Sequence, residues 1–356
     1  MHSLTRIWTP ILLTLLPTLA LAATKPAVVY SVADKYDHSV NQQVYEEGVV
    51  RYRKETGIQV TERAPAGAAE RLNTLRQLAG DGYSPIVLVG GEQVIALQTI
   101  ADEFPKTQFT LLDGQLDKPN VRSILFKVQE GAFLTGALAA AESETGIIGF
   151  VGGLDLPGIH QYGCGFEQGA KYANPAIEVK QSYAASTPAL AFADPVKGSF
   201  LAKEQFAEGV DIIFAAARGT GLGVYQAAAD EGLRAIGSDT NQNGLYPGTM
   251  LTSMFKSMGQ AAYTAWEEAE VGTWTPGVLK LGLLDNHVGW ALDANNQGLI
   301  SQGLRDKLEA LRIDIVTGKL KVHDYTQTQH CDYITPTVGA ICPPAGKAGS
   351  GTLCKS

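Results

Sequence analysis

From residue 27 to residue 239 the sequence alternates short, β-rich apolar runs with longer amphipathic stretches. The first run, AVVYSVA at 27–33, precedes a helical pattern at 41–55, and the alternation continues to IGSD at 236–239. Strands that are apolar on both faces, with helices between them, are typical of parallel sheets covered by helices. The pattern therefore predicts an α/β fold made of two successive βαβ blocks.

The first 22 residues have the features of a secretory signal peptide. They contain one early arginine, an apolar run and a small-x-small ending, Ala20-Leu21-Ala22, which is the order typical of a cleaved signal. Pro10 and Pro17 interrupt the apolar run, which falls short of the roughly 20 residues that a membrane span needs. No cysteine at the cleavage point offers an acceptor for a lipid anchor. We therefore expect cleavage near Ala22 and a soluble, periplasmic mature protein.

The chain is acidic. Its net charge at pH 7 is −8, and loss of residues 1–22, which hold one arginine and no acid, makes it −9. An acidic surface disfavours nucleic acid and anionic membranes as partners, and we expect neither. The remaining chain of about 334 residues is long enough for two units of ordinary domain size.

The pairing of the four cysteines stays open in the sequence. Cys331, Cys342 and Cys354 lie in the C-terminal tail at 326–356, whereas Cys164 lies far upstream. In an exported protein cysteines commonly form disulfides, and four cysteines allow three pairings. Proximity favours a Cys331–Cys342 loop. A zinc site is the alternative, although the spacing lacks a CxxC unit.

Polar side chains follow four of the predicted strands at the point where each strand ends. These endings are YDHSVNQ at 36–42, LLDGQ at 111–115, ARGTGLG at 217–223 and SDTNQ at 238–242. In open parallel sheets, ligands bind beyond the carboxyl ends of the strands. Three of the endings carry an aspartate, whose carboxylate suits a ligand with hydroxyl donors such as a vicinal diol. Lys256 fits either a ligand acceptor or a salt bridge with Asp239, and both roles stay open.

Other motifs favour structural roles. The glycines of RGTGLG at 218–223 match no Walker motif and are typical of a tight strand-to-helix turn. The GCG sequence around Cys164 lacks the frame of a nucleophile elbow, so we interpret this cysteine as structural or disulfide-bonded. His160, His287 and His330 show no metal-ligand spacing. The sequence predicts neither a metal site nor a cofactor.

Paired aspartates at strand ends are also compatible with hydrolysis, because a glycosidase needs only an acid and a base at a set separation. Amide side chains accompany the aspartates, namely Asn41, Gln42, Asn241 and Gln242. They favour hydrogen bonding over proton transfer, so we expect a binding protein without catalytic residues. The alternative is a cleft hydrolase, a nucleosidase or glycosidase, that uses Asp37 with Asp113 or Asp239.

Eight blocks of sequence occur in an order that is characteristic of one protein family. They are YDHSVNQQVYEEG, FPKTQFTLLD, VRSILFKVQEGAFLTGALAA, IIGFVGG, GFEQGAK, ADPVKG, GVDIIFAAARGTGLGV, and IGSDTNQ with LTSMFK. Together they resemble the basic membrane protein family, substrate-binding proteins of ABC importers that are best known as purine nucleoside receptors. The resemblance runs from about residue 26 to about residue 325.

The resemblance implies a type I periplasmic binding protein, with two doubly wound parallel-sheet lobes joined by a three-crossing hinge that closes on ligand. Lobe 1 would comprise residues 23–126 and about 240–282, and lobe 2 residues 127–239 and about 283–325. The cysteine-containing tail lies beyond the usual end of the family. We expect a monomer that binds a purine nucleoside or a similar polar molecule and delivers it to an ABC permease.

The family's ligand contacts would fall on seven residues: Asp37, Asn41, Asp113, Phe192, Gly219, Asp239 and Lys256. In that interpretation Asp239, together with Lys256, holds the ribose hydroxyls. Asn41 and Asp113 address the base edge, and Phe192 stacks on the purine. Val40 stands where the family usually has an aromatic residue, which removes one face of the expected aromatic sandwich. A ligand sensor that docks a membrane receptor is a further alternative to the importer.

Overall fold

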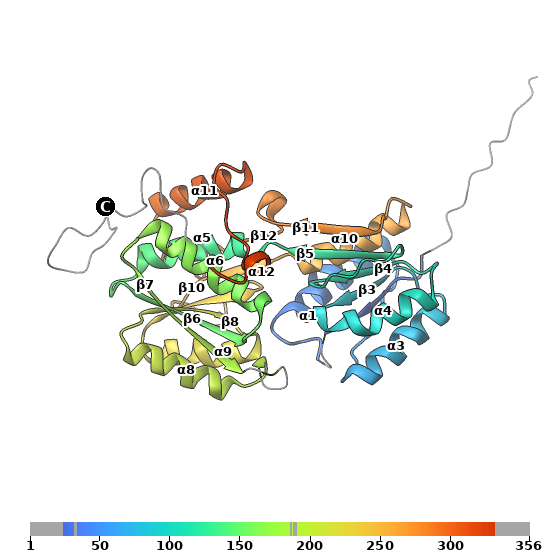
Figure 1. Ribbon diagram of the computed structural model, residues 1–356, viewed down its shortest axis with the longest axis horizontal. Helices are drawn as coiled ribbons and strands as arrows, with labels where there is room; N and C mark the ends of the chain where they lie inside the picture. The colour runs from blue at the N-terminus through green and yellow to red at the C-terminus, as the bar shows by residue number, and fades with distance from the viewer. Residues whose placement is uncertain (1–23, 32–33, 186, 188–190, 332–356) are drawn as a thin grey trace, which may run out of the picture.

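The computed structural model describes residues 24–31, 34–185, 187 and 191–331. The expected signal peptide and the tail after Cys331 lie outside these described residues. Figure 1 shows two α/β lobes that lie side by side, each a sheet between layers of helices. The predicted α/β class is confirmed.

Lobe 1 contains a six-stranded parallel sheet with the order β11-β5-β4-β3-β1-β2. Its strands are β1 (Ala27–Val29), β2 (Thr61–Arg63), β3 (Ile86–Val89), β4 (Phe109–Leu112), β5 (Val121–Phe126) and β11 (Gly277–Leu281). Its helices are α1 (Val40–Gln43), the π-helical η1 (Val44–Val50), α2 (Arg51–Thr56), α3 (Ala68–Gly80), the 3₁₀ turn η2 (Gly91–Gln93), α4 (Val94–Glu103) and α10 (Met258–Glu270).

Lobe 2 contains a second six-stranded sheet with the order β12-β10-β9-β8-β6-β7. Its strands are β6 (Ile147–Leu154), β7 (Glu178–Ala185), β8 (Ile212–Ala216), β9 (Arg234–Asp239), β10 (Met250–Lys256) and β12 (Val288–Trp290). Only β12 runs antiparallel to its neighbour within the described strands of this sheet. Its helices are α5 (Val128–Glu142), α6 (Pro157–Ala173), α8 (Pro195–Ala207), α9 (Gly219–Asp230), the 3₁₀ turn η3 (Leu284–Asn286), α11 (Gln302–Val316) and α12 (Tyr325–Thr328).

The central strands are buried on both faces because helices cover each side of the sheet. Alternate side chains of a strand point to opposite faces. In β8, Ile212 and Phe214 belong to the core that α5 and α6 share, whereas Ile213 and Ala215 pack with α8 and α9. This two-sided burial explains why the sequence shows continuous apolar runs rather than alternation.

The two lobes repeat one topology, and the chain crosses between them three times. The order β2-β1-β3-β4-β5 in lobe 1 matches β7-β6-β8-β9-β10 in lobe 2. The crossings follow β5, β10 and β11, which confirms the type I periplasmic binding fold with its three-crossing hinge. The boundary expected near residue 240 is wrong, because β10 pairs with β9. The second crossing therefore lies at Ser257, after β10 has extended the lobe 2 sheet.

Helices α5 and α6 pack at very short range through glycines. A Cβ atom at Gly136 would lie 1.9 Å from the carbonyl oxygen of Phe166, and one at Gly169 would lie 1.8 Å from that of Phe133. Since α5 is buried nearly all round, its apolar character reflects this packing. No helix of the described chain combines the length and the apolar character that crossing a membrane would require.

Candidate functional site

A cavity of about 710 Å³ lies between the lobes, at the carboxyl ends of their strands. Glu92 and Asp113, which follow β3 and β4, line it from lobe 1, whereas Arg218, Asp239 and Lys256, at the ends of β8, β9 and β10, line it from lobe 2. Doubly wound sheets place their ligands at this edge. Four of the seven predicted contacts line this cavity: Asp113, Phe192, Asp239 and Lys256.

Lys256 joins the two lobes through a network of charged and hydroxyl groups. Its Nζ donates to Asp113 Oδ2 and to the Tyr162 hydroxyl, the latter at 3.0 Å, and lies 3.2 Å from Asp239 Oδ1. The Tyr162 hydroxyl in turn donates to Asp239 Oδ1 at 2.6 Å. Asp113 follows a lobe 1 strand while the other three residues belong to lobe 2, so the Lys256–Asp113 ion pair bridges the cleft.

The surroundings fix the protonation states of three members of this network. Burial opposes the charge of Asp239, but the Lys256 ammonium, the Tyr162 hydroxyl and the charge of Arg218 outweigh it and hold the pKa of Asp239 below its ordinary value. Burial also opposes the Lys256 ammonium, yet Asp113 and Asp239 raise the pKa of Lys256 well above normal. Burial and then the Asp239 charge raise the pKa of Tyr162 well above normal. None of the three is poised to exchange a proton near neutrality.

The two aspartates occupy equivalent positions in the repeated topology. Asp113 follows the fourth strand of one sheet and Asp239 ends the fourth strand of the other. Both adopt a positive φ, 63° and 69° respectively, a conformation that is uncommon outside glycine but tolerated by aspartate. Such backbone outliers cluster at functional sites, where the surrounding structure holds them in place. The duplicated fold thus presents two carboxylates to one cavity.

Arg218 is a site residue that the sequence analysis missed. It lies between β8 and α9 with φ 46° and ψ −127°, and its guanidinium lies 5.3 Å from the ring centroid of Phe192, within cation–π range. Burial opposes its charge, but Glu92, Asp239 and Asp37 raise the pKa of Arg218 above its ordinary value. The RGTGLG motif therefore contributes its arginine to the cavity, whereas its glycines lie at the start of α9.

The charged side chains that line the cavity balance in number. There are four carboxylates, of Glu92, Asp113, Asp239 and Asp324, and four cations, of Lys127, Arg218, Lys256 and Lys280. No histidine is among the described residues that line it. A cavity without formal net charge but rich in donors and acceptors suits an uncharged polar ligand.

Asp37 and Asn41 hold the loop after β1 and do not line the cavity. Asp37 accepts three hydrogen bonds from backbone amides at the start of α1, the shortest from Ser39 at 2.9 Å. Asn41 Oδ1 accepts from the Ser31 amide at 3.0 Å, and its Nδ2 donates to the Asp34 carbonyl at 2.9 Å. The bonds of Asn41 use the amide groups that the resemblance assigns to the base edge, and those of Asp37 occupy its carboxylate.

Gly219 and Val40 also lie outside the cavity lining. Gly219 begins α9, where a Cβ would lie 3.0 Å from the Phe192 carbonyl oxygen, so it makes room for the chain that carries Phe192. Val40 is buried in the lobe 1 core. The loop that precedes Val40 meets lobe 2 instead, because Gln242 Nε2 donates to the His38 carbonyl at 3.0 Å.

Cys164 forms a disulfide with Cys331. The interpretation of Cys164 as disulfide-bonded is confirmed, and the Cys331–Cys342 pairing is wrong. The physical reason is that α12 packs against α6, which brings the end of the described chain to Cys164 across a separation of 167 residues. Cys342 and Cys354 lie outside the described residues.

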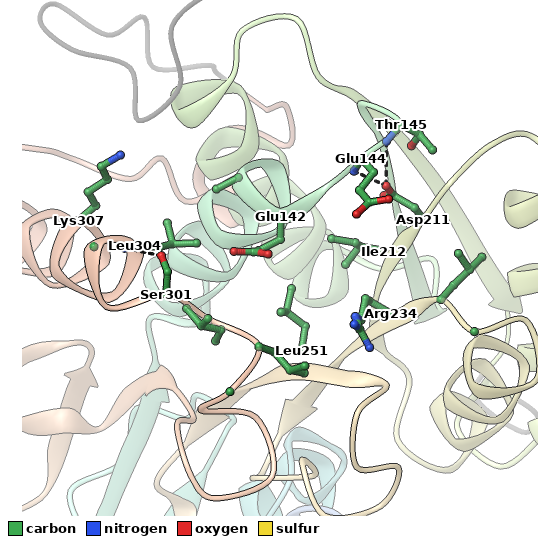
Figure 2. A pocket seen from close by; sticks show the side chains of 17 residues that line it. Glu142, Glu144, Thr145, Asp211, Ile212, Arg234, Leu251, Ser301, Leu304 and Lys307 are labelled. Atoms are coloured by element: carbon green, nitrogen blue, oxygen red, sulfur yellow. Dashed lines mark hydrogen bonds between the residues drawn. The ribbon is translucent and has the colours of Figure 1, made fainter. Parts of the chain in front are cut away.

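A second cavity, of about 910 Å³, lies where the strands of lobe 2 begin, at the opposite edge of the sheet (Figure 2). Asp211 points toward Glu144 and Thr145 in this view and accepts hydrogen bonds from both of their amides. This cavity contains none of the predicted site residues and belongs to one lobe. Although it is larger, the candidate site is the interlobe cavity, because four of the seven predicted contacts line that one.

The chain is similar to known proteins over most of its length. A family model described as ABC transporter substrate-binding protein, PnrA-like, matches residues 24–324. Basic membrane protein B of Borrelia garinii is 34% identical over 229 residues, 61% of this chain, and the match spans 65% of that relative, less than two thirds of its length. An uncharacterized lipoprotein of Pyrococcus horikoshii is 30% identical over 334 residues, which cover 89% of this chain and 80% of that protein.

Solved structures show the same architecture. The crystal structure of an ABC transporter system solute-binding protein from Aeropyrum pernix matches with a TM-score of 0.75 and 26% identity, over 85% of this chain and 93% of that one. A solute-binding protein from Conexibacter woesei matches with a TM-score of 0.68 and 21% identity, over 85% and 99% of the two chains. At that lower identity the likeness concerns the fold alone.

Proposed function

The chain belongs to the PnrA-like family of ABC transporter substrate-binding proteins, and from this premise we propose that it binds a purine nucleoside, or a similar polar small molecule, between its lobes. In this proposal the protein acts as a monomer and delivers the ligand to an ABC permease. Substrate-binding proteins of this kind work outside the cytoplasm. We propose the periplasm as the place, after signal cleavage near Ala22.

The observation that carries the proposal is the pair of aspartates that the two lobes present to one cavity. Among the described residues, the bonds to Asp239 fall on Oδ1 and the bond to Asp113 falls on Oδ2. Asp239 Oδ2 and Asp113 Oδ1 therefore remain as acceptors for hydroxyl or N–H donors of a ligand. Hydrogen bonds to ionised acceptors are about twice as strong as neutral ones, so donors on both sides of a ligand would favour closure.

An apolar wall next to these acceptors supports a ligand with a flat ring. Phe192, Phe126, Leu154 and Ile159 line the cavity together with the charged groups. The volume of about 710 Å³ lies within the range of roughly 300–1,000 Å³ that small-molecule sites occupy. A base stacked on an aromatic side chain typically contributes about 1–3 kcal/mol. Ring stacking and hydroxyl binding side by side are what a nucleoside requires.

The charge network favours binding over hydrolysis. A glycoside hydrolase needs one carboxyl group with a raised pKa as the acid and a second carboxylate as base or nucleophile. In this cavity Asp113 and Asp239 share one ammonium, and the pKa of Asp239 is lowered by Lys256 and Tyr162 against the effect of burial. We therefore propose no catalytic step.

Nucleoside-dependent thermal stabilisation tests this function. Inosine and guanosine should raise the melting temperature of the mature protein, and Asp239→Ala should abolish that rise. A missing hydrogen-bond partner costs about 1–3 kcal/mol, or roughly 5- to 150-fold in Kd. Asp314→Ala is the matched control, because Asp314 lies on α11 and pairs with the exposed Lys319.

Calorimetry and recovery of the ligand decide the outcome. Equal affinity of wild type and Asp239→Ala would remove the diol-binding role of Asp239. Free base in the incubation would show that the site hydrolyses nucleosides, whereas intact nucleoside recovered after denaturation supports a receptor.

A further inference from the structure

One stripe of α6 holds the C-terminal segment 322–331, which we call the strap. His160, Cys164 and Gln168 are spaced by four residues and so share one face of the helix. The ring of Tyr325 stacks on His160 with centroids 4.8 Å apart and an interplanar angle of 20°. Gln168 exchanges two hydrogen bonds with the main chain of His323, at 3.0 and 2.9 Å, and Cys164 forms the disulfide with the far end of the strap.

Apart from Val322, which packs against the core, and the Tyr325 ring on His160, the strap has little apolar packing. None of the residues of α12 is buried, and residues 326–330 are exposed. Ordering a chain segment costs conformational entropy that buried apolar surface usually offsets. Segments with few buried contacts open locally at low free energy. The covalent link to Cys164 restricts that opening, because a disulfide limits the conformations available to the chain it closes.

The strap also reaches the ligand cavity. Asp324 and Thr326 line it together with Asp113 and Lys256, and Figure 1 shows α12 beside α6 where the two lobes meet. Of the four carboxylates on the cavity, Asp324 is the one that no strand end supplies.

A single glutamine connects the strap to the hinge. Gln161 Nε2 donates to Asp324 Oδ1 at 3.0 Å and to Gln129 Oε1 at 2.9 Å. Gln129 lies in the first turn of α5, directly after the first crossing between the lobes. A displacement of the strap would therefore disturb hydrogen bonds both at the cavity wall and at the first crossing between the lobes.

We propose that the strap is a disulfide-anchored wall of the ligand site, in which Asp324 Oδ2 accepts a hydrogen bond from the ligand and the Cys164–Cys331 bond keeps the wall closed. Asp324 Oδ1 already accepts from Gln161 and from Thr326, whereas Oδ2 has one long bond, from Gln327 at 3.4 Å. This inference rests on the proposed function, and it assigns ligand retention to a segment outside both sheets. Without the disulfide the strap opens locally, the cavity gains a second exit, and bound ligand leaves faster.

The test compares four forms of the full mature chain. They are the wild type, the double variant Cys164→Ser/Cys331→Ser, Asp324→Asn, and Asp314→Asn as a charge-matched control on α11. The double variant leaves no unpaired thiol at either position. Inosine, guanosine and adenosine serve as probes, with Kd from calorimetry and dissociation rates from stopped-flow displacement.

We expect ligand release about 10-fold faster in the double variant, a Kd about 10-fold higher for Asp324→Asn, and wild-type values for Asp314→Asn. Asp324→Asn keeps the disulfide, so it remains informative if the double variant folds poorly. Hydrogen exchange should also speed up at 322–331 and at 157–162 in the double variant, with or without ligand.

The outcomes separate this inference from the proposed function. If the wild type binds a nucleoside and both variants match it within twofold, the strap has no role in retention and the inference is overturned, while the receptor function stands. If the wild type binds none of the three probes, the proposed function fails. Hydrogen exchange alone then tests the inference about the strap. Unchanged amide protection of residues 157–162 in the double variant would overturn that inference.

Discussion

Replacing Lys256 by methionine would leave Asp113 and Asp239 in the cleft without the ammonium that they share. The Lys256 side chain is 4% exposed and that of Asp239 10%, whereas Asp113 retains 29%. Removing one member of a buried ion pair costs about 3–5 kcal/mol, because an uncompensated charge stays behind. Methionine fills the space of the aliphatic stem, so the cost reports on charge rather than on a void. A loss of about 3–5 kcal/mol is large against a typical stability of about 5–15 kcal/mol.

The pH dependence of this loss identifies its cause. In the wild type the charge of Lys256, with Tyr162 and Arg218, outweighs burial and keeps the pKa of Asp239 below its unfolded value. The stability that this provides is present above the unfolded pKa and is lost as pH falls through the folded pKa. In Lys256→Met the largest of the contributions that oppose burial is gone, so we expect the pKa of Asp239 to rise, although Tyr162 and Arg218 remain. The variant should thus be weakest near neutrality and recover toward the wild type as acid protonates Asp239.

Urea unfolding at pH 7.5 and pH 4.5, followed by circular dichroism, measures both effects. Adding Asp239→Asn to Lys256→Met should restore roughly half of the loss at pH 7.5, since the amide removes the stranded charge. Lys319→Met is the control: that side chain is 75% exposed, so its ion pair with Asp314 should contribute less than about 1 kcal/mol. A loss below about 1 kcal/mol for Lys256→Met, or an equal loss at both pH values, would refute a buried, charge-dependent network.

Three further outcomes follow from the same contacts. Phe192→Ala should raise the Kd for nucleosides by roughly 5- to 150-fold, the equivalent of a stacking contact, and an unchanged Kd in calorimetry would speak against stacking. Gly169→Ala should lower the free energy of unfolding by about 1–3 kcal/mol, because its Cβ would meet a carbonyl oxygen of α5 at 1.8 Å; Gly303→Ala, with no atom within 4 Å, is the control in urea unfolding. Nucleoside affinity should be constant between about pH 6 and pH 8. Burial opposes both charges, but the ion pair outweighs it, so the pKa of Asp239 is lowered and that of Lys256 is raised, both away from this range. A bell-shaped pH profile of affinity in calorimetry would contradict this.

The fold follows from sequence wherever burial is two-sided. All four residues of β3 and all four of β4 are buried, and it is this continuous apolar character that predicts parallel sheets under helices. The sequence pattern does not, however, show which of the two sheets a strand joins. The residues of β10 are apolar enough for either sheet, and only the position of the crossing at Ser257 assigns them to lobe 2. Local pattern does not contain that information.

The site was predictable to the extent that it lies at strand ends. Asp113 and Asp239 follow directly from that rule, because an aspartate at the end of a buried strand has few structural reasons to be there. The strand-end rule does not identify Tyr162, because this residue lies on α6, after the turn that follows β6. Arg218 is the first residue of the RGTGLG motif. A charged residue at a junction between a strand and a helix was the sequence feature that could have identified it as lining the cavity. The Cys164–Cys331 bond joins elements whose proximity arises only from the packing of α12 on α6.

The network explains how one set of contacts can serve both closure and selectivity. Under the proposed function, closure of the lobes would withdraw Asp113 and Asp239 from water, and each keeps an acceptor oxygen that Lys256 and Tyr162 do not use in the described structure. A buried acceptor without a partner costs about 1–3 kcal/mol. A ligand with hydroxyl donors removes that cost on both sides of the cleft, whereas an apolar ligand of equal size leaves it in place. Under the proposed function, discrimination therefore comes from the penalty that the wrong ligand leaves behind, which can exceed the gain from any added apolar contact.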